Sequence, residues 1–185
     1  MDDKKNSLEI VGHRFDPIDG GPDLPEGLFH KEEPTVPAHY IVQLSRSPTR
    51  QDRKRLQKDL RLLLTDYVAH RGYIERIDPR RLDRVRKDDL VRAVVRYEPA
   101  FKISPNIGRQ KFRTAERNAI EGLLVWVVLF PQGDPREITK YIEEAGAKEL
   151  GVIDDRKLGG TARVRVLLPD RSLLAPLAQI EDVRW

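Results

Sequence analysis

Side chains that commonly carry catalysis are few and scattered in this 185-residue chain. It has no cysteine, which excludes disulfides and thiolate metal ligands. The four histidines, at positions 13, 30, 39 and 70, lack the spacing of metal ligands. Because an enzyme needs a positioned nucleophile, base or metal, the sequence predicts a protein that is not itself a catalyst. It also predicts no bound metal or cofactor.

The carboxylate pairs and glycine pairs favour structural roles. Asp88-Asp89 and Asp154-Asp155 lie at predicted turns, where aspartate forms local hydrogen bonds with the backbone. Gly159-Gly160 follows a predicted strand but lacks the pattern of a phosphate-binding loop, and Gly20-Gly21 lies in a flexible stretch. None of these groups indicates a reaction.

Charge is distributed unevenly along the chain. Residues 1–37 hold nine acidic and four basic side chains, whereas residues 50–92 hold fourteen basic and eight acidic ones. A solvated helical face explains such a basic stretch more often than nucleic-acid binding does. An RNA-recognition module would need aromatic side chains on its third strand, and residues 73–77 and 162–167 offer at most one. Nucleic acid is therefore not the expected partner.

The elements that would position any site begin after a Pro/Gly-rich acidic segment. Residues 1–38 carry five prolines and little hydrophobic periodicity, which predicts a flexible extended arm with at most a short strand near Val11 to Phe15. No apolar run approaches the roughly 18 residues that span a membrane. The first residues have no apolar region typical of a signal peptide.

A first α+β unit is predicted over residues 39–101. Strands are indicated at 40–44, 67–68, 73–77 and 91–95. Thr49 and Asp52 resemble a capping box before a helix whose apolar face holds Leu56, Leu60, Leu63 and Leu64. Asp78 and Pro79 open a second helix as N-cap and first helical residue.

A polar linker, residues 102–121, leads to a second unit over 122–185 with the same order of elements. Residues 123–130 are almost continuously apolar, which predicts a strand buried on both faces. Asp134 and Pro135 start a helix with Ile138 and Ile142 on its apolar side. Strands follow at 150–153 and 162–167. Pro176 shortens the last helix.

The two units repeat one pattern with a period of roughly 85–90 residues. The expected fold class is α+β: two tandem ferredoxin-like split βαβ sandwiches of order β-α-β-β-α-β, each with its helices on one face of an antiparallel sheet. The other face of each sheet is then a candidate binding surface, or a contact between the units or with the arm.

Residues 67–105 carry a resemblance to a known family. Tyr67 to Ile77, the aspartate-opened helix and the segment from Tyr97 to Pro105 resemble the pro-regions of bacterial subtilisin-like serine proteases, in which a Tyr-Ile-Pro stretch precedes Tyr-Leu-Val-Arg and a Tyr-x-Pro-Ala-Tyr-Lys segment follows. The second unit is similar to the repeat that follows in longer members. His70 and Arg71 depart from the family pattern, and no segment resembles the protease's aspartate, histidine or serine motifs.

The resemblance implies a non-catalytic pro-region that acts as intramolecular chaperone and temporary inhibitor of a subtilisin-like catalytic domain, in cis or in trans. It implies a secreted or periplasmic parent whose signal peptide is not among these residues, and a cytoplasmic location stays open. The family would continue past Trp185 through a processing site. No membrane partner is expected.

Residues expected to contact the partner lie mainly in the second unit. They are Trp126, Phe130, Val183, Arg184, Trp185, Tyr97 and Glu98. Three alternatives stay open: a stand-alone protein-interaction or inhibitor module, an RNA-binding protein, and a ligand-sensing tandem.

Overall fold

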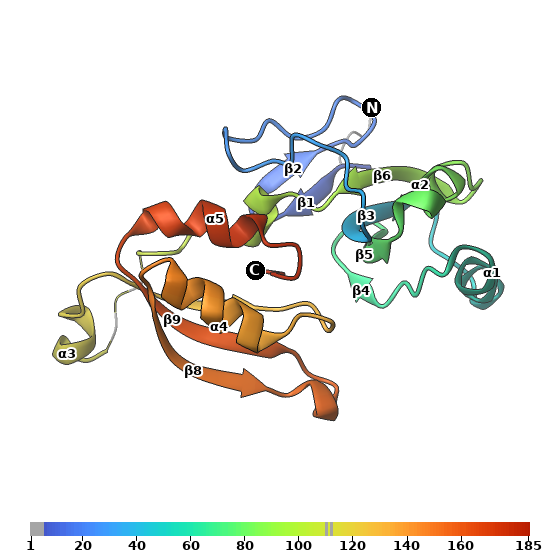
Figure 1. The fold of residues 1–185 in the computed structure, drawn as a ribbon. Helices are drawn as coiled ribbons and strands as arrows, with labels where there is room; N and C mark the ends of the chain where they lie inside the picture. Colours follow the sequence, from blue (N-terminus) through green and yellow to red (C-terminus); the bar gives the residue numbers. More distant parts are fainter. Residues whose placement is uncertain (1–5, 110, 112) are drawn as a thin grey trace. The chain divides into compact units, whose positions relative to one another are not determined.

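The chain forms two compact units, Met1–Glu98 and Pro99–Trp185, called unit 1 and unit 2 below. A computed structural model describes residues 6–109, 111 and 113–185. Each unit combines helices with antiparallel strands, as the sequence predicts for an α+β protein (Figure 1). The first five residues of the predicted arm and positions 110 and 112 of the predicted linker lie outside the described residues.

Unit 1 is built on a four-stranded antiparallel sheet. Its strands are β3 (Ala38–Leu44), β4 (Asp66–Tyr67), β5 (Gly72–Ile77) and β6 (Val91–Arg96), in the spatial order β4-β5-β3-β6. In the central register, Ile41 pairs with Ile74 on one side and with Val95 on the other. Two helices, α1 (Arg50–Leu60) and α2 (Pro79–Arg86), follow β3 and β5 along the chain.

Both helices of unit 1 begin where their capping residues predict. The Thr49 side chain accepts a hydrogen bond from the Asp52 amide while the Asp52 carboxylate accepts one from the Thr49 amide, which confirms the capping box. Asp78 caps α2 with Pro79 in its first turn. The apolar sides of the two helices, including Leu56 and Leu60, pack on the face of β3 that carries its even-numbered residues.

The predicted helical face is wrong at Leu63 because α1 ends three residues earlier. Arg61 closes the helix in the left-handed conformation, with φ of 56°, and leaves Leu63 58% exposed. Leu64 is buried as predicted, although from a loop position with φ of 52°. The buried Glu75 carboxylate accepts the amide hydrogens of Leu63 and Leu64, at 3.1 and 2.5 Å, and so fixes this loop.

Part of the expected extended arm is a β-hairpin. Strands β1 (Leu8–Ile10) and β2 (His13–Phe15) pair antiparallel through a turn in which Val11 and Gly12 have φ of 48° and 83°. Two residues with positive φ are typical of a two-residue hairpin turn. Residues 8–15 are called the cover hairpin below, because they pack against the sheet of unit 1.

Unit 2 contains a three-stranded antiparallel sheet. The strands are β7 (Leu123–Val128), β8 (Lys148–Asp154) and β9 (Ala162–Leu168), in the order β7-β9-β8. Helices α4 (Pro135–Glu144) and α5 (Leu174–Gln179) share one core with the sheet, and α3 (Ala115–Asn118) is a single exposed turn. The described part of unit 2 also has 3₁₀ turns at Pro99–Lys102, Arg156–Leu158 and Arg171–Leu173.

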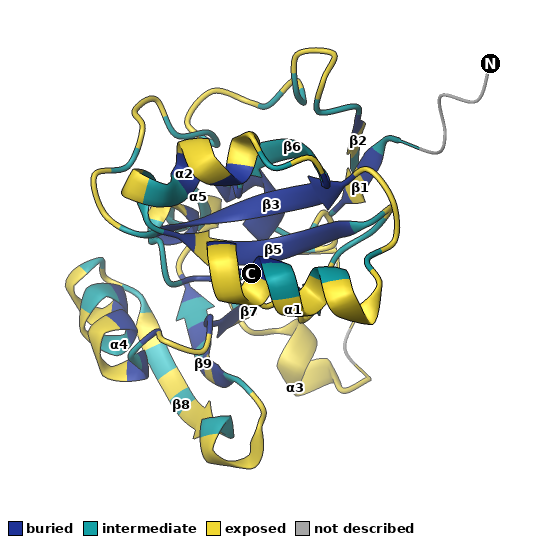
Figure 2. Ribbon diagram, turned by 90° about the vertical axis from the view of Figure 1, so that its right-hand side faces the viewer, coloured by how far each residue is buried: buried dark blue, intermediate teal, exposed yellow. Residues whose placement is uncertain are grey.

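The core of unit 2 lies between the sheet and its two main helices. Ile138 and Ile142 of α4 belong to one buried cluster with Val164 and Val166 of β9, which confirms the predicted helical face. In Figure 2, α4 shows buried positions in dark blue beside exposed ones in yellow. Asp134 caps α4 as predicted. The helix that contains Pro176 is short and is preceded by a 3₁₀ turn, also as predicted.

The contacts place the boundary between the units after Glu98 rather than after residue 101. Pro99–Lys102 is entirely buried and packs against α5. The Lys102 ammonium donates a hydrogen bond to the carbonyl of Ile180 at 2.8 Å. The start of the predicted linker is therefore part of unit 2.

Residues 182–185 run beside the end of β7. Val183 forms a β-bridge with Leu129, and the Phe130 amide donates to Asp182 at 2.9 Å. The Arg184 amide donates to the Val128 carbonyl at 2.8 Å, and the Val128 amide donates to Trp185 at 2.6 Å. Residues 182–185 thus occupy one end of the β7 edge that faces away from β9.

Candidate functional site

The second face of the unit 1 sheet is closed by the cover hairpin. On β3, the odd-numbered residues His39, Ile41 and Gln43 point away from the helices, and all three are buried. A Cβ added at Gly72 would meet both Leu8 of the hairpin and Ile41 of the sheet, so these side chains lie in contact range. The sheet of unit 1 therefore has its own cover.

A polar network ties the cover hairpin to the sheet. Gln43 donates to the Asn6 carbonyl at 2.9 Å and accepts from Arg92 at 2.7 Å. Arg92 also binds Asp16 at 2.8 Å, and this guanidinium holds the pKa of Asp16 below its ordinary value. Arg71 donates to the Asn6 side chain at 2.9 Å. The polar side chains on this face of the unit 1 sheet therefore find hydrogen-bond partners within the same unit.

The corresponding face of unit 2 is open. Alternation along β7 sends Val125 and Val127 into the core and Trp126 to the opposite face, where it is 42% exposed. The prediction that this strand is buried on both faces is wrong, because only one of them carries helices. We call this the open face and define it by one set of side chains: Leu124, Trp126, Ile153, Arg163, Arg165 and Leu167.

Cationic groups surround the indole on the open face. Arg165 of β9 is the direct cross-strand partner of Trp126. The Arg163 guanidinium carbon lies 5.6 Å from the centre of the Trp126 ring, within the range of a cation–π contact. An exposed aromatic ring beside arginines is the composition that protein interfaces concentrate at their energetic centres.

The other residues predicted at this site divide into buried and exposed groups. Phe130 is 2% exposed, with the Arg184 guanidinium 5.9 Å from its ring, and Val183 is also buried. Trp185 is 54% exposed. The structure therefore brings Trp126, Val183 and Trp185 together around one cavity of unit 2. Phe130 contacts the Arg184 guanidinium through its ring.

Tyr97 and Glu98 belong to unit 1 and form internal contacts there. Tyr97 is buried, and its amide donates to the carbonyl of His39 at 2.9 Å. Glu98 accepts hydrogen bonds from the amide and from the imidazole Nδ1 of His30, at 2.7 and 2.8 Å. These contacts attach residues of the N-terminal segment to the end of β6. Partner binding by Tyr97 and Glu98 stays a prediction.

The two aspartate pairs have local structural partners. Arg55 forms two hydrogen bonds with Asp88, at 2.6 and 3.0 Å, and holds the pKa of that carboxyl below its ordinary value. In unit 2, hydrogen bonding from Arg156 lowers the pKa of Asp154 to about 2. Within residues 6–109, 111 and 113–185, no three histidine or carboxylate side chains gather as metal ligands would.

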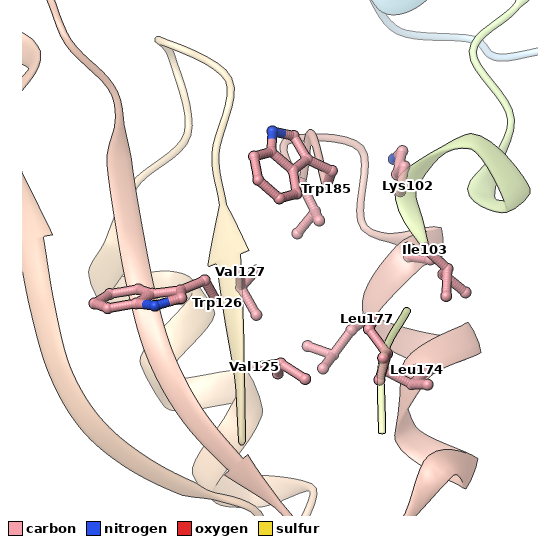
Figure 3. Close-up of a pocket in the computed structure, with 11 residues that line it drawn as sticks. Lys102, Ile103, Val125, Trp126, Val127, Leu174, Leu177 and Trp185 are labelled. Atoms are coloured by element: carbon pink, nitrogen blue, oxygen red, sulfur yellow. The ribbon is translucent and has the colours of Figure 1, made fainter. Parts of the chain in front are cut away.

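A small apolar cavity lies beside the free part of the β7 edge, and we call it the edge groove. Its volume is about 40 Å³. Val125 and Val127 point toward Leu174, Leu177 and Ile103 across it, whereas the Trp126 ring points to the other side of the strand (Figure 3). The groove is far smaller than pockets for drug-sized ligands, which run about 300–1,000 Å³.

Sequence reasoning missed two groups of this site. Arg163 and Arg165 were part of a strand pattern, and only the register shows that they flank Trp126. Lys102 and Ile103 were assigned to a linker, yet they line the edge groove. The alternation of Arg163 and Arg165 with valines was the one signal in the sequence that β9 has a polar face.

Comparison with known proteins matches unit 1 alone. Residues 10–98, just under half of the chain, are similar to the family described as Domain of unknown function (DUF8729). The matched stretch starts within the cover hairpin and ends at the last residue of unit 1. No curated protein and no solved structure matches the chain. None of the helices in the described parts of the chain is both long and apolar enough to span a membrane.

Proposed function

We propose that this chain is the non-catalytic pro-region of a subtilisin-like serine protease, and that it acts as folding template and temporary inhibitor. Each unit is proposed to be a ferredoxin-like split βαβ sandwich, with residues 182–185 taking the place of the fourth strand in unit 2. The strand order β4-β5-β3-β6 supports this assignment for unit 1. The resemblance of residues 67–105 to such pro-regions supports the function.

One observation supports different roles for the two units. The free sheet face of unit 1 is closed by the cover hairpin, whereas the open face of unit 2 exposes Trp126 between Arg163 and Arg165. Unit 2 is therefore the unit proposed to dock on the catalytic domain, and unit 1 is auxiliary. A tryptophan that becomes buried in an interface removes about 150–250 Å² from water, which makes Trp126 the expected energetic centre.

A folding role has a physical basis in topology. An α/β protease domain depends on contacts between distant segments, and such domains fold slowly because loop-closure entropy precedes the stabilising contacts. A preformed sheet with an exposed aromatic centre can bind one partly folded surface of the protease and lower that barrier. The same contact holds the inhibitor in place afterwards.

The test is a titration of the catalytic domain encoded in the same gene or beside it. Inhibition of peptide hydrolysis is measured with the full chain, with Trp126→Ala and with Leu158→Ala. Leu158 is 88% exposed in the 3₁₀ turn after β8, is not one of the residues that define the open face, and serves as the matched control. We expect Trp126→Ala to weaken inhibition about 30-fold or more, which corresponds to about 2 kcal/mol, and Leu158→Ala to leave it unchanged.

Two results would count against the proposal. If the full chain bound and inhibited no such protease, the interaction-module alternative would replace it. If both variants inhibited like the unaltered chain, the open face would not be the docking surface.

RNA binding is the second candidate, because Trp126 and the two arginines lie on neighbouring strands where a base could stack. Against it, β9 offers no aromatic side chain on that face. Titration with a fluorescent single-stranded RNA distinguishes the two functions. Binding that is lost in Trp126→Ala would favour RNA.

A further inference from the structure

The edge of β7 that faces away from β9 is only half paired. The Leu129 amide donates to Ala162 beyond the end of β9, so the main-chain groups of the odd-numbered residues point toward that strand. The even-numbered Val128 and Phe130 point the other way and are paired with residues 182–185. By the same alternation, the main-chain groups of Leu124 and Trp126 point to this outer edge.

Leu124 and Trp126 have no main-chain partner on that edge among the residues that the structure describes. Each contributes one N–H donor and one C=O acceptor, which makes four adjacent groups. Unpaired groups on a strand edge are a template for another strand.

The edge groove lies where the side chains of an added strand would point. The bridge between Val183 and Leu129 starts an antiparallel register, and Arg184 and Trp185 then form a β-bulge opposite Val128. Both of their amides donate to the Val128 carbonyl, at 2.8 and 3.3 Å, and the Val128 amide donates to the Trp185 carbonyl. The third residue of a strand added after Trp185 would therefore lie opposite Val125, with its side chain on the same side of the sheet as the core. That side is the groove between β7 and α5, whose volume of about 40 Å³ suits the end of an aliphatic side chain.

We propose that this edge is a strand-addition site, and that its occupant is an extended segment of a protein partner with apolar side chains at alternate positions. The segment runs antiparallel to β7, beginning next to Trp185 and continuing the ladder that residues 182–185 start. Its main chain bonds Leu124 and Trp126, and its apolar side chains enter the edge groove. The main-chain bonds supply affinity and the groove supplies selectivity. This site uses the main chain of Leu124 and Trp126, whereas the open face uses their side chains, and it does not depend on the protease assignment.

The test supplies such a strand at high effective concentration by attaching it to the chain. The sequence Val-Thr-Val-Thr is added after Trp185, which places its two valines opposite Val127 and Val125, on the groove side. Hydrogen exchange of individual amides is followed by NMR in the extended and unextended chains. We expect exchange of the Leu124 and Trp126 amides to slow at least tenfold in the extended chain. The Val128 amide, already bonded to Trp185, serves as internal reference.

Two matched extensions separate the main-chain and side-chain contributions. Val-Pro-Val-Pro keeps both valines in register but removes the two N–H groups that would donate to the Trp126 and Leu124 carbonyls, so it should protect their amides less than Val-Thr-Val-Thr does. Thr-Val-Thr-Val shifts the valines to the other face and should also protect less than Val-Thr-Val-Thr.

Three outcomes would overturn the proposal: unchanged exchange in all chains, equal protection by the proline version, or protection in the unextended chain that rises with protein concentration. The last result would mean that a second copy of the chain occupies the edge. None of these measurements uses a protease, so they fail or succeed independently of the proposed function.

Discussion

Truncating one buried side chain in each unit should reveal whether the units melt independently. Leu60 is 3% exposed at the end of α1, and Ile142 is 1% exposed on α4. Replacing such a residue by alanine removes buried methyl groups and leaves a cavity, at a cost of about 2–4 kcal/mol in the free energy of unfolding. In a domain of 60–100 residues that loss lowers the melting temperature by roughly 10–25 °C.

Differential scanning calorimetry resolves the two effects. Leu60→Ala should lower the transition of unit 1 alone, and Ile142→Ala that of unit 2 alone, because each side chain belongs to a separate core. Leu158→Ala is the control, since an exposed leucine removes little buried area. A single transition shifted equally by both core variants would refute the independence of the units. An unchanged melting temperature in either core variant would refute the assigned helical face.

Three further predictions concern unit 1. Leu8→Ala should lower the free energy of unfolding by less than Leu56→Ala does, because a hairpin of two three-residue strands can detach while the sheet stays folded. Equal losses in a urea titration would show that the hairpin is integral to the core. Burial raises the pKa of Glu75, so the stability that this side chain contributes is full below about pH 4.5 and declines as the pH rises through its folded-state pKa. In thermal melts at a series of pH values, the unaltered chain should lose stability over this pH range relative to Glu75→Gln. Arg92 lowers the pKa of Asp16, so the stability from this ion pair is full above about pH 3.8 and is lost as the pH falls through the folded-state pKa of Asp16. Amide exchange in residues 8–15 should accelerate over that fall in pH in the unaltered chain. In Asp16→Asn it should show no such acceleration.

Local signals located the helix starts but not every end. Thr49, Asp78 and Asp134 cap the starts of their helices with side chains that accept backbone hydrogen bonds. Because this preference depends on residue type, the helix starts can be predicted from sequence alone. The end of α1 had no such signal, because a left-handed residue there is usually glycine and here is Arg61. The exposure of Leu63 follows from that one residue.

The candidate site was predictable only in part, because burial of a sheet face depends on what covers it. Trp126 and Phe130 lie at the same parity in an apolar run, yet one is exposed and the other buried. The difference arises just beyond β7, where the main chain of residues 182–185 pairs with Phe130 and the Arg184 guanidinium lies over its ring. The cover hairpin was missed because its apolar residues are too few and too far apart for a periodic pattern.

The cover hairpin also has a consequence for synthesis on the ribosome. Residues 8–15 leave the ribosome before the sheet of unit 1, but the ion pair that attaches Asp16 joins a residue 76 positions later, Arg92. At about 5–20 residues per second, translation of that interval takes roughly 4–15 s. A two-stranded hairpin is at best marginally stable alone, so its apolar side chains wait in an unfolded segment until β6 is complete. Slowing or stalling translation between the hairpin and β6 would lengthen that exposure, and a chain released before Arg92 would lack the partner of Asp16.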